Sequence, residues 1–198
     1  MKKTQTLGAI AILLAAAAVA PAQEAVVWHG FVDAGYAGNF DLRNDSFGAN
    51  QVEIDLTREE SPGVRLRADL EWVYDGDAWV AAVEQGFVAW RLAFWDAATF
   101  TLGKFNAPIG WELPDAPDMQ QATHGLLFTY AAPTNLTGAM LAGSLGAALD
   151  WKAYAANGWD RDVENNGVKT WGGRLGYTRA GRGGIGISVI SGEEDDAQ

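Results

Sequence analysis

The sequence predicts an all-β protein, specifically an antiparallel transmembrane up-and-down β-barrel. Apolar and polar residues alternate along most of the chain, and the segments that alternate are joined by connections that are long and short in turn. The composition agrees, with 24 Gly and 9 Trp but few long apolar runs. A strand that crosses a bilayer needs about 9–11 residues, with apolar side chains toward lipid, polar side chains inward and aromatic rings at the interfaces.

Residues 64–74 show the pattern most clearly. Their apolar face carries Val64, Leu66, Ala68, Leu70, Trp72 and Tyr74. Their polar face carries Arg65, Arg67, Asp69 and Glu71. Alternation over this length, with two aromatic rings at one end, matches each requirement of a transmembrane strand.

The same alternation predicts nine strands in all. They are expected at residues 26–38, 50–57, 64–74, 86–94, 99–105, 136–143, 147–156, 168–178 and 183–190. Short connections are expected at 61–63, 96–98, 143–144 and 179–183, and long ones at 41–46, 74–77, 106–135 and 157–167. Alternating long and short connections are typical of outer-membrane barrels, which have long outer loops and short periplasmic turns.

Nine strands is an odd number, whereas bacterial barrels have an even number. We therefore expect this sequence to be the N-terminal part of a larger barrel, one that does not form a functional pore by itself. The alternative is a tenth strand within residues 120–131. A barrel with a water-filled pore usually has about 16 strands.

The first 22 residues have the features of a Sec-type signal peptide. Lys2 and Lys3 precede an uncharged, Ala- and Leu-rich stretch at 7–20, and Ala20-Pro21-Ala22 fits a cleavage site. An N-terminal anchor helix is the alternative. We expect residues 1–22 to be a signal peptide, residues 23–198 to belong to the barrel, and the mature protein to reach the bacterial outer membrane.

Composition excludes several function classes. The formal charge of −11 argues against nucleic-acid binding, which requires a basic surface, and the absence of Cys excludes thiolate chemistry. The sequence has no Gly-x-Ser-x-Gly motif, no phosphate-binding loop and no metal-spaced His pair, and His29 and His124 each stand alone. We expect no enzyme activity, no cofactor and no metal site.

Charged residues on the polar faces of the predicted strands are the candidate pore lining. They are Glu53, Asp55, Arg65, Arg67, Asp69, Glu71, Arg91, Asp150, Lys152 and Arg174. Across the 61–63 turn, Asp55 is expected to face Arg65 or Arg67, and Glu53 to face Arg67. Such pairs either create a transverse field in the pore or simply neutralise each other and keep the wall hydrated.

The long 106–135 connection is the candidate constriction loop. Four prolines stiffen it by fixing φ. Its candidate lining residues are Glu112, Asp115, Asp118 and His124. Acidic residues in the outer loops either attract or bind cations, or are only solvated.

One segment resembles a known family. Gly103-Lys104-Phe105-Asn106-Ala107-Pro108-Ile109-Gly110-Trp111-Glu112 is similar to the GKF-x-x-P-x-G-x-E segment of Gram-negative porin-like outer-membrane β-barrels, including the β-barrel porin and phosphate-selective porin groups. Thr137-Gly138 and the segment 157–160, Asn-Gly-Trp-Asp, resemble recurring segments of the same barrels. With the alternating strands, the resemblance covers most of residues 27–190.

The resemblance implies passive diffusion of small hydrophilic solutes or ions through a barrel longer than this chain. The partners expected with it are outer-membrane lipid and lipopolysaccharide, the solute, and a second and third copy in a homotrimer. Phosphate selectivity depends on lysine-rich pore walls, and this chain has few lysines. The alternatives are a non-transporting barrel for adhesion or envelope structure, a soluble periplasmic carbohydrate-binding β-sandwich, and an outer-membrane hydrolase.

Overall fold

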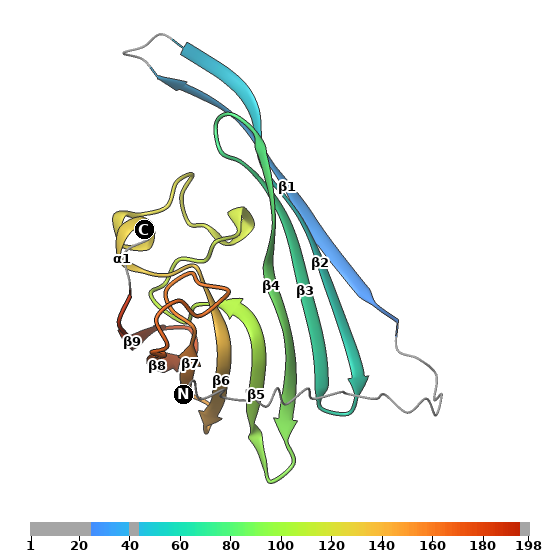
Figure 1. Ribbon diagram of the computed structural model, residues 1–198, viewed down its shortest axis with the longest axis vertical. Coiled ribbons are helices and arrows are strands. Elements are labelled where there is room, and N and C mark those ends of the chain that lie inside the picture. Colours follow the sequence, from blue (N-terminus) through green and yellow to red (C-terminus); the bar gives the residue numbers. More distant parts are fainter. Residues whose placement is uncertain (1–24, 40–43, 195–198) are drawn as a thin grey trace, which may run out of the picture.

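The computed structural model describes residues 25–39 and 44–194, which form one nine-stranded antiparallel sheet (Figure 1). Each strand pairs with the next along the chain. The strands are β1 (Val27–Asn39), β2 (Asn44–Ser61), β3 (Val64–Tyr74), β4 (Trp79–Leu92), β5 (Trp95–Asn106), β6 (Asn135–Leu145), β7 (Leu149–Ala156), β8 (Thr170–Arg179) and β9 (Gly183–Ser191). The predicted up-and-down all-β architecture is confirmed, and the predicted signal peptide lies outside the described residues.

The sheet is open and forms a single layer. Within the described ranges, β1 and β9 each pair with one strand only, and no second sheet packs on the first. The alternative of a β-sandwich therefore does not hold for the described residues. The alternative of a tenth strand in 120–131 is wrong too, because that stretch contains the short helix α1 (Leu126–Ala131). A 3₁₀ turn, η1 (Ala116–Asp118), precedes it in the same connection. No helix in the described part of the chain is long and apolar enough to cross a membrane.

Strand register gives the sheet two chemically different faces. Directly paired residues share a face, so Leu70 lies with Ile54 and Val83 on what we call the outer face. Large apolar side chains remain exposed there: Val32 is 64% exposed and Ile187 is 65% exposed. This outer face has no partner in the described residues, whereas the opposite, inner face carries most of the charged side chains of the strands.

The small apolar core lies on the inner face of β5 to β7. Phe105, Leu136, Tyr154 and Ala156 are buried together there. Gly103 and Gly138 are directly paired beside this cluster. A Cβ on either glycine would overlap the backbone of the neighbouring strand, and Gly103 has φ +133°. These two positions therefore require glycine if the strands are to pack this closely.

Two of the predicted short turns are misplaced, and β2 and β4 begin earlier than predicted, at Asn44 and Trp79. The expected turn at 96–98 lies inside β5, because the chain turns between Leu92 and Trp95. The expected turn at 143–144 lies inside β6, which continues to Leu145. In the first case a register shift between Arg91 and Leu92 interrupts the alternation. In the second, small residues carry little periodic signal.

Candidate pore wall and inward loop

The connection between β5 and β6, residues 107–134, folds over the inner face of the sheet (Figure 1). The Ala116 amide donates to Gln51 Oε1 at 3.2 Å, which attaches the loop to β2. On the opposite side, Ser188 Oγ donates to the Pro108 carbonyl at 3.1 Å, and Arg174 Nη1 donates to the Gly110 carbonyl at 3.5 Å. The loop therefore spans the inner face from β2 to β8 and β9.

The base of this loop is held by a second connection, residues 157–169. Asp160 Oδ1 accepts hydrogen bonds from the Thr134 amide at 2.8 Å and from the Asn135 amide at 2.8 Å. Within the same connection, Glu164 accepts from backbone amides that include Asn166 and Gly167, both at 3.2 Å. Lys169 Nζ also donates to Glu164, and this contact is the largest of the influences that lower the pKa of the Glu164 carboxyl.

Arg67 neutralises two acids of the inner face on β2 and β3. Its Nε lies 2.7 Å from Asp69 Oδ2, and its Nη2 lies 3.4 Å from Asp55 Oδ1. Gln85 Nε2 also donates to Asp69 at 2.5 Å. Asp69 is fully buried, so this arrangement supplies the partners that a buried carboxylate requires.

The predicted contact of Glu53 with Arg67 is wrong. In the β2–β3 register, Glu53 faces Glu71, and Asp55 faces Asp69, while Arg67 reaches Asp55 only along the diagonal. Arg65 forms its ion pair with Glu59 at 2.8 Å. The physical reason is that β2 continues to Ser61 before a tight turn, which fixes the pairing of the two strands.

A cluster of carboxyl groups occupies the inner face of β2 to β4. Glu53, Glu71 and Glu84 each place one carboxylate oxygen within 4.8 Å of the others. Asp115, from the loop just before η1, lies beside Glu53 and Glu84, and burial raises the pKa of its carboxyl. Loop and wall therefore meet at four acidic groups.

Sequence reasoning missed Glu84. The predicted strand at 86–94 begins after Glu84, whereas β4 begins at Trp79. A β-bulge also interrupts the alternation there: Asp69 pairs with Gln85 and the next residue, Leu70, pairs with Val83, so Glu84 is the extra residue. The bulge turns Glu84 and Gln85 to the same face, which strict alternation does not allow. The one feature of the sequence that could have pointed to Glu84 is that an acidic residue directly follows the apolar segment 79–83.

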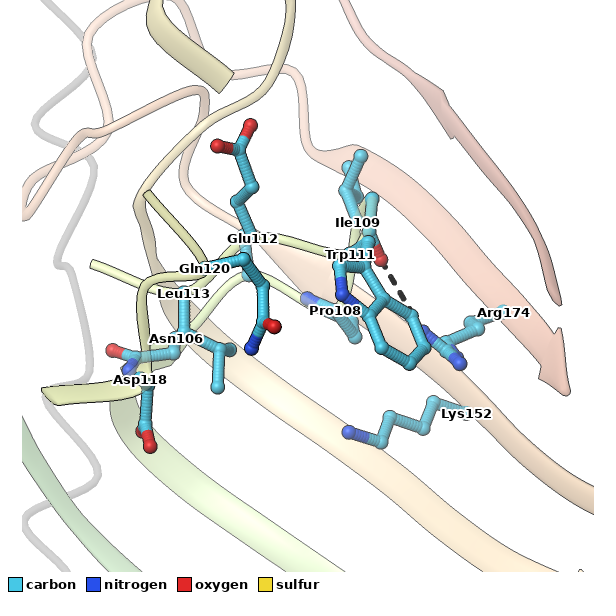
Figure 2. A pocket seen from close by; sticks show the side chains of 12 residues that line it. Asn106, Pro108, Ile109, Trp111, Glu112, Leu113, Asp118, Gln120, Lys152 and Arg174 are labelled. Carbon is cyan, nitrogen blue, oxygen red and sulfur yellow. Dashed lines mark hydrogen bonds between the residues drawn. The ribbon is translucent and has the colours of Figure 1, made fainter. Parts of the chain in front are cut away.

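Lys152 and Arg174 lie opposite each other on the inner face of β7 and β8. They line a pocket of about 400 Å³ beneath the loop, together with Asp118 and the segment 106–113. Figure 2 shows both basic side chains directed into this pocket below Trp111. Asp150 Oδ1 lies 3.7 Å from Arg174 Nε. Positive charge therefore gathers on the wall of β7 and β8.

The four predicted loop residues do not form one ring. Glu112 Oε1 accepts from the Gly125 amide at 2.9 Å and so closes the loop on itself. His124 stacks on Phe128, with ring centroids 4.0 Å apart. Asp115 joins the acidic cluster, whereas Asp118 lines the basic pocket. Arg91 lies apart from both groups, exposed near the turn at Gly63.

A comparison with known protein families agrees with this architecture. The family model described as putative beta-barrel porin-2, OmpL-like, matches residues 26–198. The chain belongs to this porin family. The family agrees with the predicted porin-like resemblance, and with a sheet that has an apolar exposed face and a charged inner face. Searches of curated proteins and of solved structures found no match.

Proposed function

We propose that the protein is an outer-membrane channel for the passive diffusion of small hydrophilic solutes or ions. The observation that carries this proposal is the inner face, which is charged and is crossed by the loop 107–134, opposite an apolar outer face. A charged wall keeps water in a pore, and a loop across it limits the size of the solute.

The outer face supports a position in lipid. The charged residues that belong to the outer face lie toward the ends of the strands. Arg58 and Glu60, just before the turn at Gly63, are examples. Lys104 lies toward the other end, where its Nζ is 3.1 Å from Asp162 Oδ1 in the connection 157–169. Between these ends the face is apolar, as required because a charge at mid-bilayer costs about 2–4 kcal/mol.

The charge distribution favours a transverse field in the channel. The acidic cluster lies on β2 to β4, and the basic pair Lys152 and Arg174 lies on β7 and β8. Opposed charges across a water-filled constriction orient water and separate the paths of cations and anions. The acidic excess of the chain as a whole favours cations.

Liposome swelling tests the proposal. Liposomes that contain the complete protein should swell in isotonic glucose and more slowly in isotonic raffinose, because the loop narrows the path for the larger sugar. Protein-free liposomes are the control. Failure to swell in either sugar, with the protein folded and inserted, would contradict the channel and favour the non-transporting barrel.

A further inference from the structure

We propose that Glu53, Glu71, Glu84 and Asp115 bind one divalent cation, with Ca²⁺ preferred, and that the cation fastens the loop 107–134 to the wall. This inference goes beyond the proposed channel function, since the binding does not depend on solute passage.

The spacing of the carboxylates suits Ca²⁺. One oxygen each of Glu53, Glu71 and Glu84 lies within 4.8 Å of the others. Ca²⁺ binds oxygen at 2.3–2.6 Å, so two ligands on opposite sides of the ion are separated by about 4.6–5.2 Å. The three wall residues therefore lie near enough to share a single ion without a change in strand register.

The second observation is that two of these carboxylates are buried and that several oxygens of the cluster lack hydrogen-bond partners. Glu53 and Glu84 are each 2% exposed. Both oxygens of Glu84, one of Glu53 and Oδ1 of Asp115 have no hydrogen-bond partner among the described residues. Buried polar groups in folded proteins are almost always satisfied, and a buried charge without a partner is costly. A bound cation would satisfy these atoms together.

The basic side chains nearby are already engaged. Arg67 contacts Asp69 and Asp55, and Lys104 contacts Asp162. Within the described ranges, no Lys or Arg forms an ion pair with Glu53, Glu71 or Glu84. The basic side chains of the described residues therefore do not balance the cluster.

The ligand set selects the class of ion. All the candidate ligands are carboxylate oxygens, which favour hard cations over Zn²⁺ or Cu²⁺. Ca²⁺ accepts irregular arrangements of carboxylates, whereas Mg²⁺ requires near-ideal octahedral geometry and retains water. A cluster assembled from three strands and a loop fits the more tolerant ion.

The position of Asp115 links the cation to the loop. Asp115 precedes Ala116, whose amide already donates to Gln51 Oε1 on β2. A cation shared by Asp115 and the wall would hold the same turn by a second, stronger attachment. Removing the cation should therefore loosen the loop while the strands remain paired.

Calcium titration of the complete protein in detergent, after treatment with EDTA and dialysis, tests the proposal. Calorimetry should show one Ca²⁺ site that Mg²⁺ fills more weakly. Glu84→Gln should bind Ca²⁺ about tenfold more weakly or not at all, because affinity follows the charge of the ligand set. Glu59→Gln, on the same wall but paired with Arg65, should bind as the unmodified protein does.

Proteolysis reports on the loop. The loop holds no Lys or Arg, but Leu126 and Tyr130 are exposed sites for chymotrypsin. Ca²⁺ should slow cleavage there in the unmodified protein and in Glu59→Gln, but not in Glu84→Gln. Asp77→Asn, in a different acidic loop, is the control for nonspecific binding and should also keep the protection.

Either of two results would overturn the proposal: no saturable Ca²⁺ binding, or equal binding by Glu84→Gln and the unmodified protein. The first result would indicate that the carboxyl groups share protons instead.

Heat-modifiable migration in gels checks folding, and Glu71→Gln, at a less buried position, replaces Glu84→Gln if that variant misfolds. If both misfold, cleavage of the unmodified protein at equal rates in Ca²⁺ and EDTA would overturn the proposal. None of these measurements depends on conductance, so the channel proposal is tested separately.

Discussion

Gly138 shows how closely two strands of this wall approach. A Cβ at this position would overlap the Ala155 carbonyl oxygen and lie 2.7 Å from the Ala156 Cα. The backbone there is otherwise ordinary, so the requirement for glycine is steric. Gly103, which pairs directly with Gly138, must also be glycine, because a Cβ at Gly103 would overlap the backbone of β4.

Gly138→Ala should therefore destabilise the protein by about 1–3 kcal/mol, the usual cost of adding a methyl group where no space exists. Denaturant unfolding in detergent, followed by tryptophan fluorescence, measures the change. Gly35→Ala in β1 is the matched control, because the nearest atom to its Cβ is 3.9 Å away, and its stability should change by less than about 0.5 kcal/mol. Equal effects of the two substitutions would contradict the steric argument.

Individual residues were predictable from the sequence where alternation is unbroken. Asp55, Asp69 and Lys152 lie on the inner face as expected, because a period of two fixes the face of every side chain in a regular strand. Glu84 was missed because the predicted strand at 86–94 excluded the first half of β4, and because a bulge inserts one residue there and reverses the faces beyond it. The residue that faces Glu53 depends on the register between β2 and β3, and the apolar–polar pattern of a single strand does not determine that register.

Among the elements, the loop 107–134 differs most from a simple connection. It is fixed at its base by Asp160 and across the inner face by Gln51 and Ser188. The sequence predicted its length and stiffness from its prolines. The residues that fasten it, Gln51 and Ser188, carried no sign of this role, since uncharged polar side chains on a strand give no indication of a distant partner.

Deleting residues 113–131 should raise single-channel conductance, because the deletion removes η1 and α1 from the inner face while the attachments at Pro108 and Asp160 remain. Planar-bilayer recording of the deletion variant and the unmodified protein measures the difference. Conductance that does not change would show that the loop does not narrow the channel.

The connection 157–169 should respond to acid. Contact with Lys169 and the backbone amides lowers the pKa of Glu164 below its ordinary value of 4.5. The stabilisation is therefore complete above pH 4.5 and is lost as the pH falls through the lower, folded-state pKa. Protection factors for hydrogen exchange in 164–169, which correct for the intrinsic pH dependence of exchange, should fall in that acidic range. Glu164→Gln should exchange faster at neutral pH and lose this pH response; an unchanged response would contradict the assignment.

The molecule as a whole separates charge across its inner face and keeps its outer face apolar. The family match and the single open sheet agree with the fold that alternation predicted. Alternation alone did not show how the inner face meets the loop: three wall acids lie beside Asp115 of the loop on one side, and the pocket of Lys152 and Arg174 lies on the other.

This separation predicts a change in ion selectivity. Lys152 directs its ammonium group into the pocket beneath the loop (Figure 2) and forms no ion pair in the described part of the chain. Lys152→Gln should shift the reversal potential in a salt gradient toward greater cation selectivity, and the shift should shrink at high ionic strength. Arg91→Gln, near a turn and outside the pocket, is the control. A shift toward anions would contradict the proposed path.

Single-channel recording of the complete protein in a planar bilayer tests the central claim most directly. The account predicts discrete conductance steps that grow with salt concentration and that are absent without protein. A folded protein that inserts into the bilayer and produces no steps would contradict the channel and leave a barrel with a structural or adhesive role.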